Sequence, residues 1–565
     1  MVLKLRMENS LDLRSGGLLS IELAKELTKI THSVRDEYTD YIGRLAQTNS
    51  LTGLDWLVNV TCRNQDQTKI FDNFCKLRLL ESCLDINLQL NTVIVEDQGM
   101  YEAVYALCRK HGANFTVEFA TTGGSAVLSR FMHLLRRVAI LVYISLISFV
   151  IPILLKKKKI IPDHSIIYLD MFAKVSDFDE NGDFIDRHYP GLLQTLERGQ
   201  ADKAWYAPIL SIRAPDDLKL FINGVERSNN RFLIMEQWLN VSDYLFAFFQ
   251  SFKLPRRIKK VPDYCGVDIS AIILRESALD IFSAGIFDSL LRYRFFQRLK
   301  ESGIKIDKVI DWSENQVVDR ALCLGVRSFY PSVRIIGYQG FIVSEYYVSH
   351  EPSWYEREAG TIPDVICVMN EALVSRKKKY CPDQKIVVAP AFRFMNLMNY
   401  HSVVDSVRDI ILLALPVHID TSRMIIQLCL RVHEDFNYKF QIKIHPTYTK
   451  KRFLVEIPEA SDSRFKFVEN SLYDLFPDTA LLVSSDSSAC FEAIYCGVSV
   501  IIIGNRTGPT FSPLDGIVSS EYWDVCYDPD CLMKMLAKTD QSFKINRDMQ
   551  LMPVTKESAK EFIAL

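Results

Sequence analysis

The stretch LLVSSDSSACFEAIYCGVSVIIIG, residues 481–504, places four serines, a glutamate and a glycine between two apolar runs. The apolar runs are typical of buried strands, and residues 489–496 between them are typical of a short helix that Gly497 ends. Strand, helix and strand in this order form the unit of a parallel α/β sheet. The serines fall where the first strand ends, so they either cap the helix or hold an anionic ligand.

Similar apolar runs recur along the rest of the chain in two series. The later series covers 364–370, 385–390, 409–416, 440–446, 480–485 and 498–504. The earlier series covers 54–60, 91–97, 115–120, 165–172, 306–312 and 333–340. Apolar strands that alternate with helices predict parallel sheets covered on both faces. The expected fold is therefore α/β, with two Rossmann-like, doubly wound domains that face each other across a cleft.

The length of 565 residues is too great for a single core, which supports more than one domain. We expect a helical segment at 1–50 and an N-terminal Rossmann-like domain at 51–362. The second Rossmann-like domain follows at 363–540, after a hinge at 356–364, and a tail or helix occupies 541–565.

Charge and cysteine content exclude some classes of protein. The net charge of −2 gives no basic face for nucleic acid. Thirteen cysteines occur without a CxxC pair, a pattern typical of reduced thiols in a cytosolic protein and not of a disulfide framework or a zinc site.

One segment departs from the pattern of a soluble protein. Residues 138–155 are 18 uncharged residues between Arg136-Arg137 and the lysines 156–159, which is the lower limit for a spanning helix. If strands before residue 120 and after residue 165 share one sheet, both flanks lie on the same side of a bilayer. We therefore expect a membrane-associating insertion that dips into one leaflet. A single span is the alternative if residues 1–135 fold separately, and a buried core helix is the third reading.

The first candidate site lies in the later series. Ser484, Ser485, Ser487 and Ser488 follow one strand, and Glu492 stands in the first turns of the next helix. His445 and Pro446 end the neighbouring apolar run, where an imidazole can meet a phosphate or a sugar oxygen. A histidine at a strand end and serines at a helix start are also ordinary structural features. Their occurrence together favours a ligand site.

These residues resemble the donor half of GT-B glycosyltransferases that build bacterial surface polysaccharide, such as capsule, lipopolysaccharide and O-antigen. The similarity is greatest to sialyl-, polysialyl- and Kdo-transferases, which carry His-Pro and Ser-Ser motifs. The resemblance implies that His445 and Pro446 contact a CMP group, the four serines its phosphate and Glu492 its ribose. Val500 stands where many retaining enzymes have a second glutamate.

A second motif, DWSENQ at 311–316 followed by GYQG at 337–340, resembles a segment of surface-carbohydrate transferases. Glu314 is the first candidate for the base that deprotonates an acceptor hydroxyl, although it also suits a helix cap. The resemblance makes Asn315, Tyr338 and Gln339 candidate binding residues. We expect the glycines of GYQG to provide unusual backbone angles. The histidine that usually follows the glutamine is absent.

Asp97 in VEDQGM, residues 95–100, is the rival base. Sialyl- and polysialyltransferases supply the base from an acidic pair before glycine, but Gln98 interrupts that pattern here. Asp97 is equally suited to capping the next helix.

No metal site is expected. The segment 177–188 begins like a calcium loop, but its twelfth position is His188 and not a glutamate, which favours a surface turn.

The sequence thus predicts a metal-independent glycosyltransferase with a nucleotide-sugar co-substrate, CMP-linked by preference, and no further cofactor. The acceptor would be a lipid-linked or growing surface glycan at the cytoplasmic face of the inner membrane. Attachment would be peripheral or monotopic, or through one span. Two alternatives stay open: a CDP-polyol phosphotransferase of similar fold, and an inactive membrane scaffold of a polysaccharide assembly complex. Nucleic acid is not an expected partner.

Overall fold

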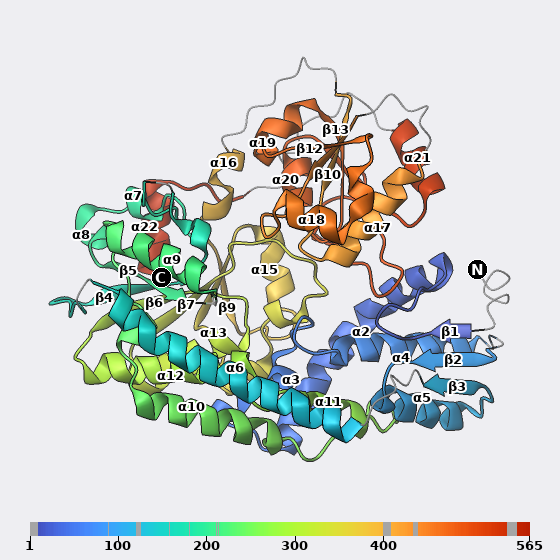
Figure 1. The fold of residues 1–565 in the computed structure, drawn as a ribbon, viewed down its shortest axis with the longest axis horizontal. Coiled ribbons are helices and arrows are strands. Elements are labelled where there is room, and N and C mark those ends of the chain that lie inside the picture. Colours follow the sequence, from blue (N-terminus) through green and yellow to red (C-terminus); the bar gives the residue numbers. More distant parts are fainter. Residues whose placement is uncertain are drawn as a thin grey trace.

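The structure is a computed structural model (Figure 1). It describes residues 10–86, 88, 90–119, 126–156, 159–179, 181–210, 212, 214–398, 408–432, 439–538 and 551–565, without the side chains of 126–131 and 537–538. The predictions for residues 1–9 and 541–550 lie outside the described residues.

The first large sheet is six-stranded and parallel, in the order β5-β4-β6-β7-β8-β9. Its strands are β4 (Ile166–Phe172), β5 (Ala204–Ile209), β6 (Ile306–Trp312), β7 (Arg334–Tyr338), β8 (Val365–Val368) and β9 (Lys385–Val388). One face is covered by α12 (Ala284–Glu301) and α13 (Val317–Phe329), and the other by α7 (Leu192–Thr195) and α22 (Lys556–Ala564). We call this unit, residues 165–398 with 551–565, the N-terminal Rossmann domain.

The second large sheet is also six-stranded and parallel, in the order β12-β11-β10-β13-β14-β15. Its strands are β10 (Ile410–Ala414), β11 (Lys439–Lys443), β12 (Phe465–Phe467), β13 (Thr479–Ser484), β14 (Ser499–Ile503) and β15 (Trp523–Cys526). Apolar cores lie on both faces, one with α20 (Ala489–Tyr495), the other with α17 (Ile419–Leu430), α18 (Lys450–Glu456) and α21 (Pro529–Lys538). We call this unit, residues 408–538, the C-terminal Rossmann domain. Two such domains make the GT-B fold.

The predicted boundary at residue 363 does not match the strand pairing. The runs at 364–370 and 385–390, expected to open the second domain, form β8 and β9 at the edge of the first sheet. The apolar patterns of the two series are alike, so the sequence has no mark of which sheet a strand joins. The chain passes between the domains after α16 (Met395–Met398).

The first residues form a unit of their own, the N-terminal unit (residues 10–119). Its three-stranded parallel sheet comprises β1 (Ser10–Asp12), β2 (Thr92–Val95) and β3 (Thr116–Phe119). Its main helices are α2 (Ile21–Thr48), α4 (Ile70–Asp85) and α5 (Gln98–His111). The strand predicted at 54–60 is wrong, because that run forms the 3-10 helix Gly53–Trp56 and the helix α3 (Asn59–Cys62).

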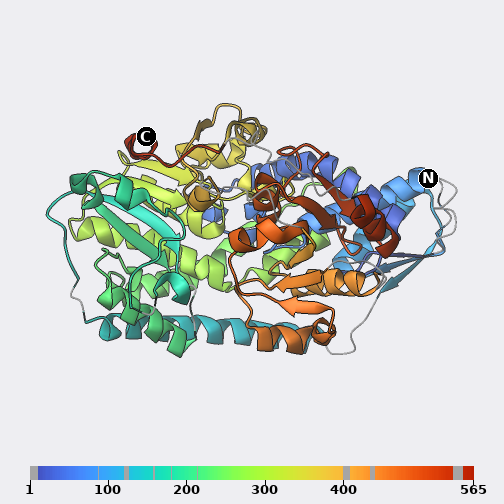
Figure 2. The same ribbon diagram turned by 90° about the horizontal axis from the view of Figure 1, so that it is seen from above.

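The strands before residue 120 and after residue 165 thus belong to different sheets. The one-leaflet insertion was predicted on the condition that they share one sheet, and that condition is not met. The N-terminal unit is nevertheless not separate, since its core continues into α10 (Val241–Lys253), α11 (Ser270–Leu279) and α12. The insertion itself is α6 (Ala126–Leu154), which lies lengthwise along one edge of the molecule (Figure 2).

The end of the chain returns to the first sheet. Ala559, Phe562 and Ile563 of α22 are buried in the core that covers one face of that sheet. Figure 1 shows α22 beside α7, away from the C-terminal Rossmann domain. The tail is therefore part of the N-terminal Rossmann domain.

Candidate functional site

Each large sheet has one point where the strand order reverses, and ligands in open α/β sheets bind at the carboxyl ends of the strands there. The reversal lies between β4 and β6 in one sheet and between β10 and β13 in the other. At the second reversal Ser484 Oγ donates a hydrogen bond of 2.5 Å to the carbonyl of Ala414, the last residue of β10. Ser484 and the serines that follow it therefore lie at the strand ends where this topology places ligands.

The four serines differ in what their hydroxyls can reach. Ser484 and Ser485 are buried, and the carbonyl of Ser485 accepts the amide N–H of Ser487 at 2.9 Å. Ser487 Oγ accepts the amide N–H of Ala489, the first residue of the seven-residue helix α20, at 3.3 Å. Ser488 and Ser487 remain partly exposed. The structure thus assigns a structural contact to Ser484 and leaves Ser487 and Ser488 accessible to a ligand.

Glu492 on α20 is half-buried and partly engaged. Its Oε2 accepts the hydroxyl proton of Tyr473 at 2.7 Å, and Ser488 Oγ lies 3.5 Å from its Oε1. Burial raises the pKa of the Glu492 carboxyl. One carboxyl oxygen is therefore held by the protein, and the other has only a long contact.

His445 follows β11 and is half-buried, with Pro446 exposed beside it. Its Nδ1 lies 2.6 Å from Thr447 Oγ1 and accepts the amide N–H of Thr447 at 3.3 Å. Burial lowers the pKa of His445, and the charges of Lys174 and Arg393 lower it further. The imidazole is thus neutral at pH 7, with the proton on Nε2.

Glu314 follows β6 in the other domain. Its Oε1 accepts the indole N–H of Trp312 at 3.1 Å, and its Oε2 accepts the side-chain N–H of Gln316 at 2.6 Å. Burial raises its pKa, and the charges of Arg393 and Lys174 oppose that rise. A carboxylate with a raised pKa, held by two donors, has the properties of a general base.

Lys174 and Arg393 connect these two domains electrostatically. Both cations act on Glu314 of the N-terminal Rossmann domain and on His445 of the C-terminal one. Both side chains are exposed, and neither forms an ion pair within the described part of the chain. Glu314 and His445 thus share one electrostatic environment, whose positive charges are suited to an anionic ligand.

Neither Lys174 nor Arg393 was predicted from the sequence. A usable signal existed, since Lys174 comes two residues after β4 and Arg393 five residues after β9. Ligands in open α/β sheets bind at the carboxyl ends of strands, where both residues lie. Single exposed cations are common, however, and these two occur in no motif.

His188, which the sequence presented only as the residue that spoils a calcium loop, is a further group beside this site. Its ring packs edge-on against Trp312, with the ring centroids 4.7 Å apart. Its Nε2 accepts the amide N–H of Phe172 at 3.4 Å, and its buried Nδ1 has no hydrogen-bond partner among the described residues. Burial lowers its pKa to about 3, so it is a neutral acceptor at pH 7.

Three predicted binding residues are buried in internal contacts. The side-chain amide of Asn315 donates to the carbonyl of Ser349 at 2.8 Å and to Glu356 Oε1 at 3.1 Å. Gln339 donates to the carbonyl of His350 at 3.1 Å. Tyr338 donates to the carbonyl of Pro390 at 2.7 Å and accepts the amide N–H of Phe392 at 3.1 Å. Tyr338 thereby positions the segment that carries Arg393.

The reason for the glycines in GYQG is space and not an unusual backbone angle. Neither Gly337 nor Gly340 has a positive φ. A Cβ on Gly337 would lie 2.5 Å from Pro363 Cγ, and one on Gly340 would collide with the rings of Trp312 and Tyr338.

Asp97, the rival base, lies in the N-terminal unit. Its Oδ1 accepts the amide N–H of Met100 at 3.0 Å, which caps α5, and its Oδ2 forms an ion pair with Arg275. No described contact connects Asp97 with Glu314 or His445.

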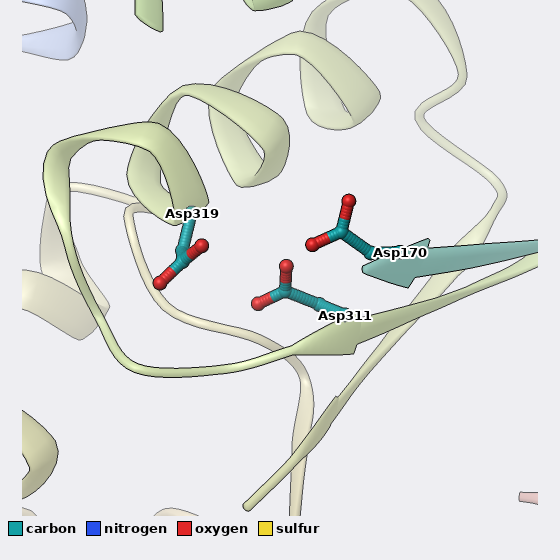
Figure 3. Close-up of side chains that lie close together, drawn as sticks. All are labelled: Asp170, Asp311 and Asp319. Atoms are coloured by element: carbon teal, nitrogen blue, oxygen red, sulfur yellow. The ribbon is translucent and has the colours of Figure 1, made fainter. Parts of the chain in front are cut away.

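Three buried aspartates lie beneath the loop of Glu314. Asp170 in β4, Asp311 in β6 and Asp319 in α13 point their carboxyl groups toward one another (Figure 3), with oxygens within 4.8 Å. Arg292 pairs with Asp170. Burial raises the pKa of Asp319 to about 8 and that of Asp311 as well, so the group retains protons at pH 7. Asp319 Oδ2 accepts the amide N–H of Glu314 at 3.1 Å, which makes the cluster a support for the candidate base.

Comparisons with known proteins find only distant similarity. No protein-family model and no curated protein match the chain. The UDP-GlcNAc 2-epimerase of Neisseria meningitidis bound to UDP-GlcNAc is 10% identical with a TM-score of 0.39, over 71% of this chain and 99% of that one. MurG of Acinetobacter baumannii is 9% identical with a TM-score of 0.36, over 71% and 98%. The glycosyltransferase SnogD of Streptomyces nogalater is 13% identical with a TM-score of 0.37, over 71% and 99%. At this level the GT-B fold rests on the strand order itself.

Proposed function

We propose that the protein is a metal-independent glycosyltransferase that moves a sugar from a nucleotide donor, CMP-linked by preference, to a lipid-linked or growing surface glycan. The observation that carries the proposal is the pair of exposed cations, Lys174 and Arg393, which act on both Glu314 and His445. A donor phosphate between the domains would be bound by these cations, since a carboxylate or a neutral imidazole alone would not compensate its charge.

In this mechanism Glu314 takes the proton of the acceptor hydroxyl while that oxygen attacks the anomeric carbon of the donor sugar. The bond from that carbon to the nucleotide phosphate breaks, and the phosphate oxygen gains negative charge. Lys174 and Arg393 compensate this charge, and Nε2 of His445 donates a hydrogen bond to the departing group. The accessible hydroxyls of Ser487 and Ser488 add neutral donors on the same side.

Nucleotide-induced stabilisation tests the proposal. The wild-type protein is heated with CMP, CDP, UDP or GDP, and the midpoint of unfolding is compared with that of the free protein. We expect cytidine nucleotides to raise the midpoint, because a ligand that binds only the folded state stabilises it. His445→Ala should reduce the shift without changing the midpoint of the free protein. A preference for UDP or GDP would refute the CMP-linked donor, and no shift with any nucleotide would contradict the transferase.

Two further experiments distinguish the transferase from the two alternatives, a CDP-polyol phosphotransferase and an inactive scaffold. A CDP-polyol phosphotransferase predicts that CDP stabilises more than CMP, and that a CDP-linked polyol is consumed with release of CMP. An inactive scaffold predicts that Glu314→Gln leaves function in the cell intact.

A further inference from the structure

Among the described side chains of α6, the fully buried ones lie on one stripe of the helix. This stripe comprises Leu141, Ile144, Ser148 and Ile151, and Leu155, which directly follows the helix, is buried as well. The large apolar side chains on the other sides are exposed: Met132, Leu134, Leu135, Ile140, Val142, Tyr143, Leu146, Phe149, Val150, Ile153 and Leu154. Only 22% of the most apolar part of this helix is buried. Its apolar character therefore exceeds what packing on the protein requires.

Helix α10, which the sequence did not single out, also carries exposed apolar side chains. Val241, Leu245, Phe249 and Phe252 are between 38% and 61% exposed. Their spacing of four, four and three residues places them on one side of the helix. The ring of Phe149 on α6 packs on Tyr244 of α10, with centroids 4.7 Å apart. The exposed apolar side chains of α6 and those of α10 thus lie on neighbouring helices, and we call the surface that they form the α6–α10 face.

The α6–α10 face has basic margins and lacks exposed acidic groups within its two helices. Residues 126–161 contain no aspartate or glutamate. The one acid between 241 and 260 is Asp243, which is buried and paired with Arg294 and Arg298. At one end of the face stand the exposed cations Lys253, Arg256, Lys259 and Lys260, for which no ion pair occurs in the described part of the chain.

One of these cations, Arg256, contacts an apolar side chain of α10. The guanidinium of Arg256 lies 3.4 Å from the centroid of the Phe252 ring. At the opposite end of α6 stand Lys156 and Lys159, with the ammonium of Lys159 3.6 Å from the centroid of the Trp238 ring. Lys157 and Lys158 lie outside the described residues. Apolar side chains bordered by cations at both ends match a lipid monolayer with anionic headgroups.

We propose that the α6–α10 face lies flat on an anionic lipid surface, with α6 and α10 both in the plane of the headgroups. A crossing by α6 is disfavoured because its packed stripe joins two cores. Leu141 and Ile144 belong to the core of the N-terminal unit, whereas Ile151 and Leu155 belong to a core with α9 (Pro215–Arg227). A spanning α6 would open both cores. This proposal is independent of the proposed catalytic function.

Sedimentation of the full chain with vesicles tests the lipid surface. Vesicles of phosphatidylcholine alone are compared with vesicles that also contain phosphatidylglycerol. We expect binding to the second kind and much weaker binding to the first. Leu245→Ser and Phe249→Ser on α10 should each lower the partition coefficient about tenfold, the effect of losing one buried large apolar side chain. The matched control is Val455→Ser on α18, a 73% exposed apolar residue in the C-terminal Rossmann domain.

Charge-reversal variants test the contribution of the basic residues at the end of the α6–α10 face. Lys259→Glu and Lys260→Glu should each lower binding to the anionic vesicles at least about fivefold. Lys451→Glu, an exposed lysine on α18, should have no effect. Far-ultraviolet circular dichroism and the unfolding midpoint of each variant confirm that it is folded.

Two results would overturn the proposal. If wild-type protein ignores both kinds of vesicle, the face does not bind lipid. If Leu245→Ser and Phe249→Ser bind like wild type while Leu146→Ser on α6 loses binding, α6 inserts without α10 and the flat arrangement is wrong. In either case the nucleotide-binding experiments keep their meaning, because they use soluble ligands.

Discussion

At the scale of single residues, Glu314 gives the sharpest prediction about chemistry. Burial raises its pKa above the ordinary value of 4.5, and a base must be deprotonated to act. We therefore expect kcat/KM to rise with pH along a limb whose apparent pKa lies above 4.5. Glu314→Gln should lower kcat/KM by about 10²–10⁴-fold, the usual contribution of a general base, and abolish this limb. A Glu314→Gln enzyme with the same pH profile would exclude Glu314 as the base.

Gly340 gives a prediction about packing. An alanine there would place its Cβ 2.8 Å from Trp312 Cζ3 and against the ring of Tyr338. Because both rings are buried, Gly340→Ala should lower the free energy of unfolding by about 1–3 kcal/mol, measured by urea denaturation. The control is Gly199→Ala in α8 (Arg198–Ala201), where nothing lies within 4 Å. Equal stability of the two variants would show that the space beside Trp312 does not constrain Gly340.

The sequence indicated candidate site residues by their type and their position at strand ends, but not whether their side chains are accessible to a ligand. It selected Glu314 and His445 from their places at strand ends, and the structure puts both under the influence of the same two cations. It could not show that the amide of Asn315 is consumed by Ser349 and Glu356, because those residues are distant in sequence.

At the scale of elements, the junction of β4, β6 and α13 makes a prediction about pH. The pKa of Asp319 is raised to about 8 and that of Asp311 is raised too, so the folded state binds protons that the unfolded state has lost. The stabilisation from these protons is complete below pH ~4 and is lost as the pH rises toward 8. Asp311→Asn replaces one of these carboxyl groups by a neutral amide, so the variant loses less stability as the pH rises. It should raise the free energy of unfolding at pH 8, on the order of 1 kcal/mol, and change it little at pH 4.

The control for this cluster lies on the same strand. Asp307 of β6 is exposed, so Asp307→Asn should leave the dependence of stability on pH unchanged. Denaturant titrations at both pH values measure the two variants together with wild type. An Asp311→Asn variant whose stability changes between pH 4 and pH 8 by the same amount as that of wild type would contradict the raised pKa values.

Elements were predicted well where the apolar run was long and its neighbours were regular. The runs at 306–312, 409–416 and 480–485 form β6, β10 and β13. The run at 54–60 misled because a short apolar segment fits a buried helix as well as a strand. β5 was missed within a stretch of mixed pattern.

At the scale of the whole molecule, contacts distant in sequence hold the units together. The amide N–H of Leu19, before α2, donates to the carbonyl of Arg506 in the C-terminal Rossmann domain at 2.8 Å. Thr28 Oγ1 accepts the amide N–H of Thr510 at 3.1 Å. The tail, residues 551–565, returns from the C-terminal Rossmann domain to the N-terminal one, where Phe562 is buried against the first large sheet. No local pattern predicts such contacts, which is why the domain boundaries were the least successful part of the sequence analysis.

Lys174 and Arg393 act on residues of both Rossmann domains, and the proposal that they hold a nucleotide phosphate can be tested directly. Calorimetric titration of CMP is performed on wild type, Lys174→Ala, Arg393→Ala and the control Lys451→Ala. We expect each of the first two variants to weaken binding by about 10–100-fold, the loss of one charged hydrogen bond, and the control to match wild type. Equal affinity in all four proteins would contradict a phosphate site between the two domains.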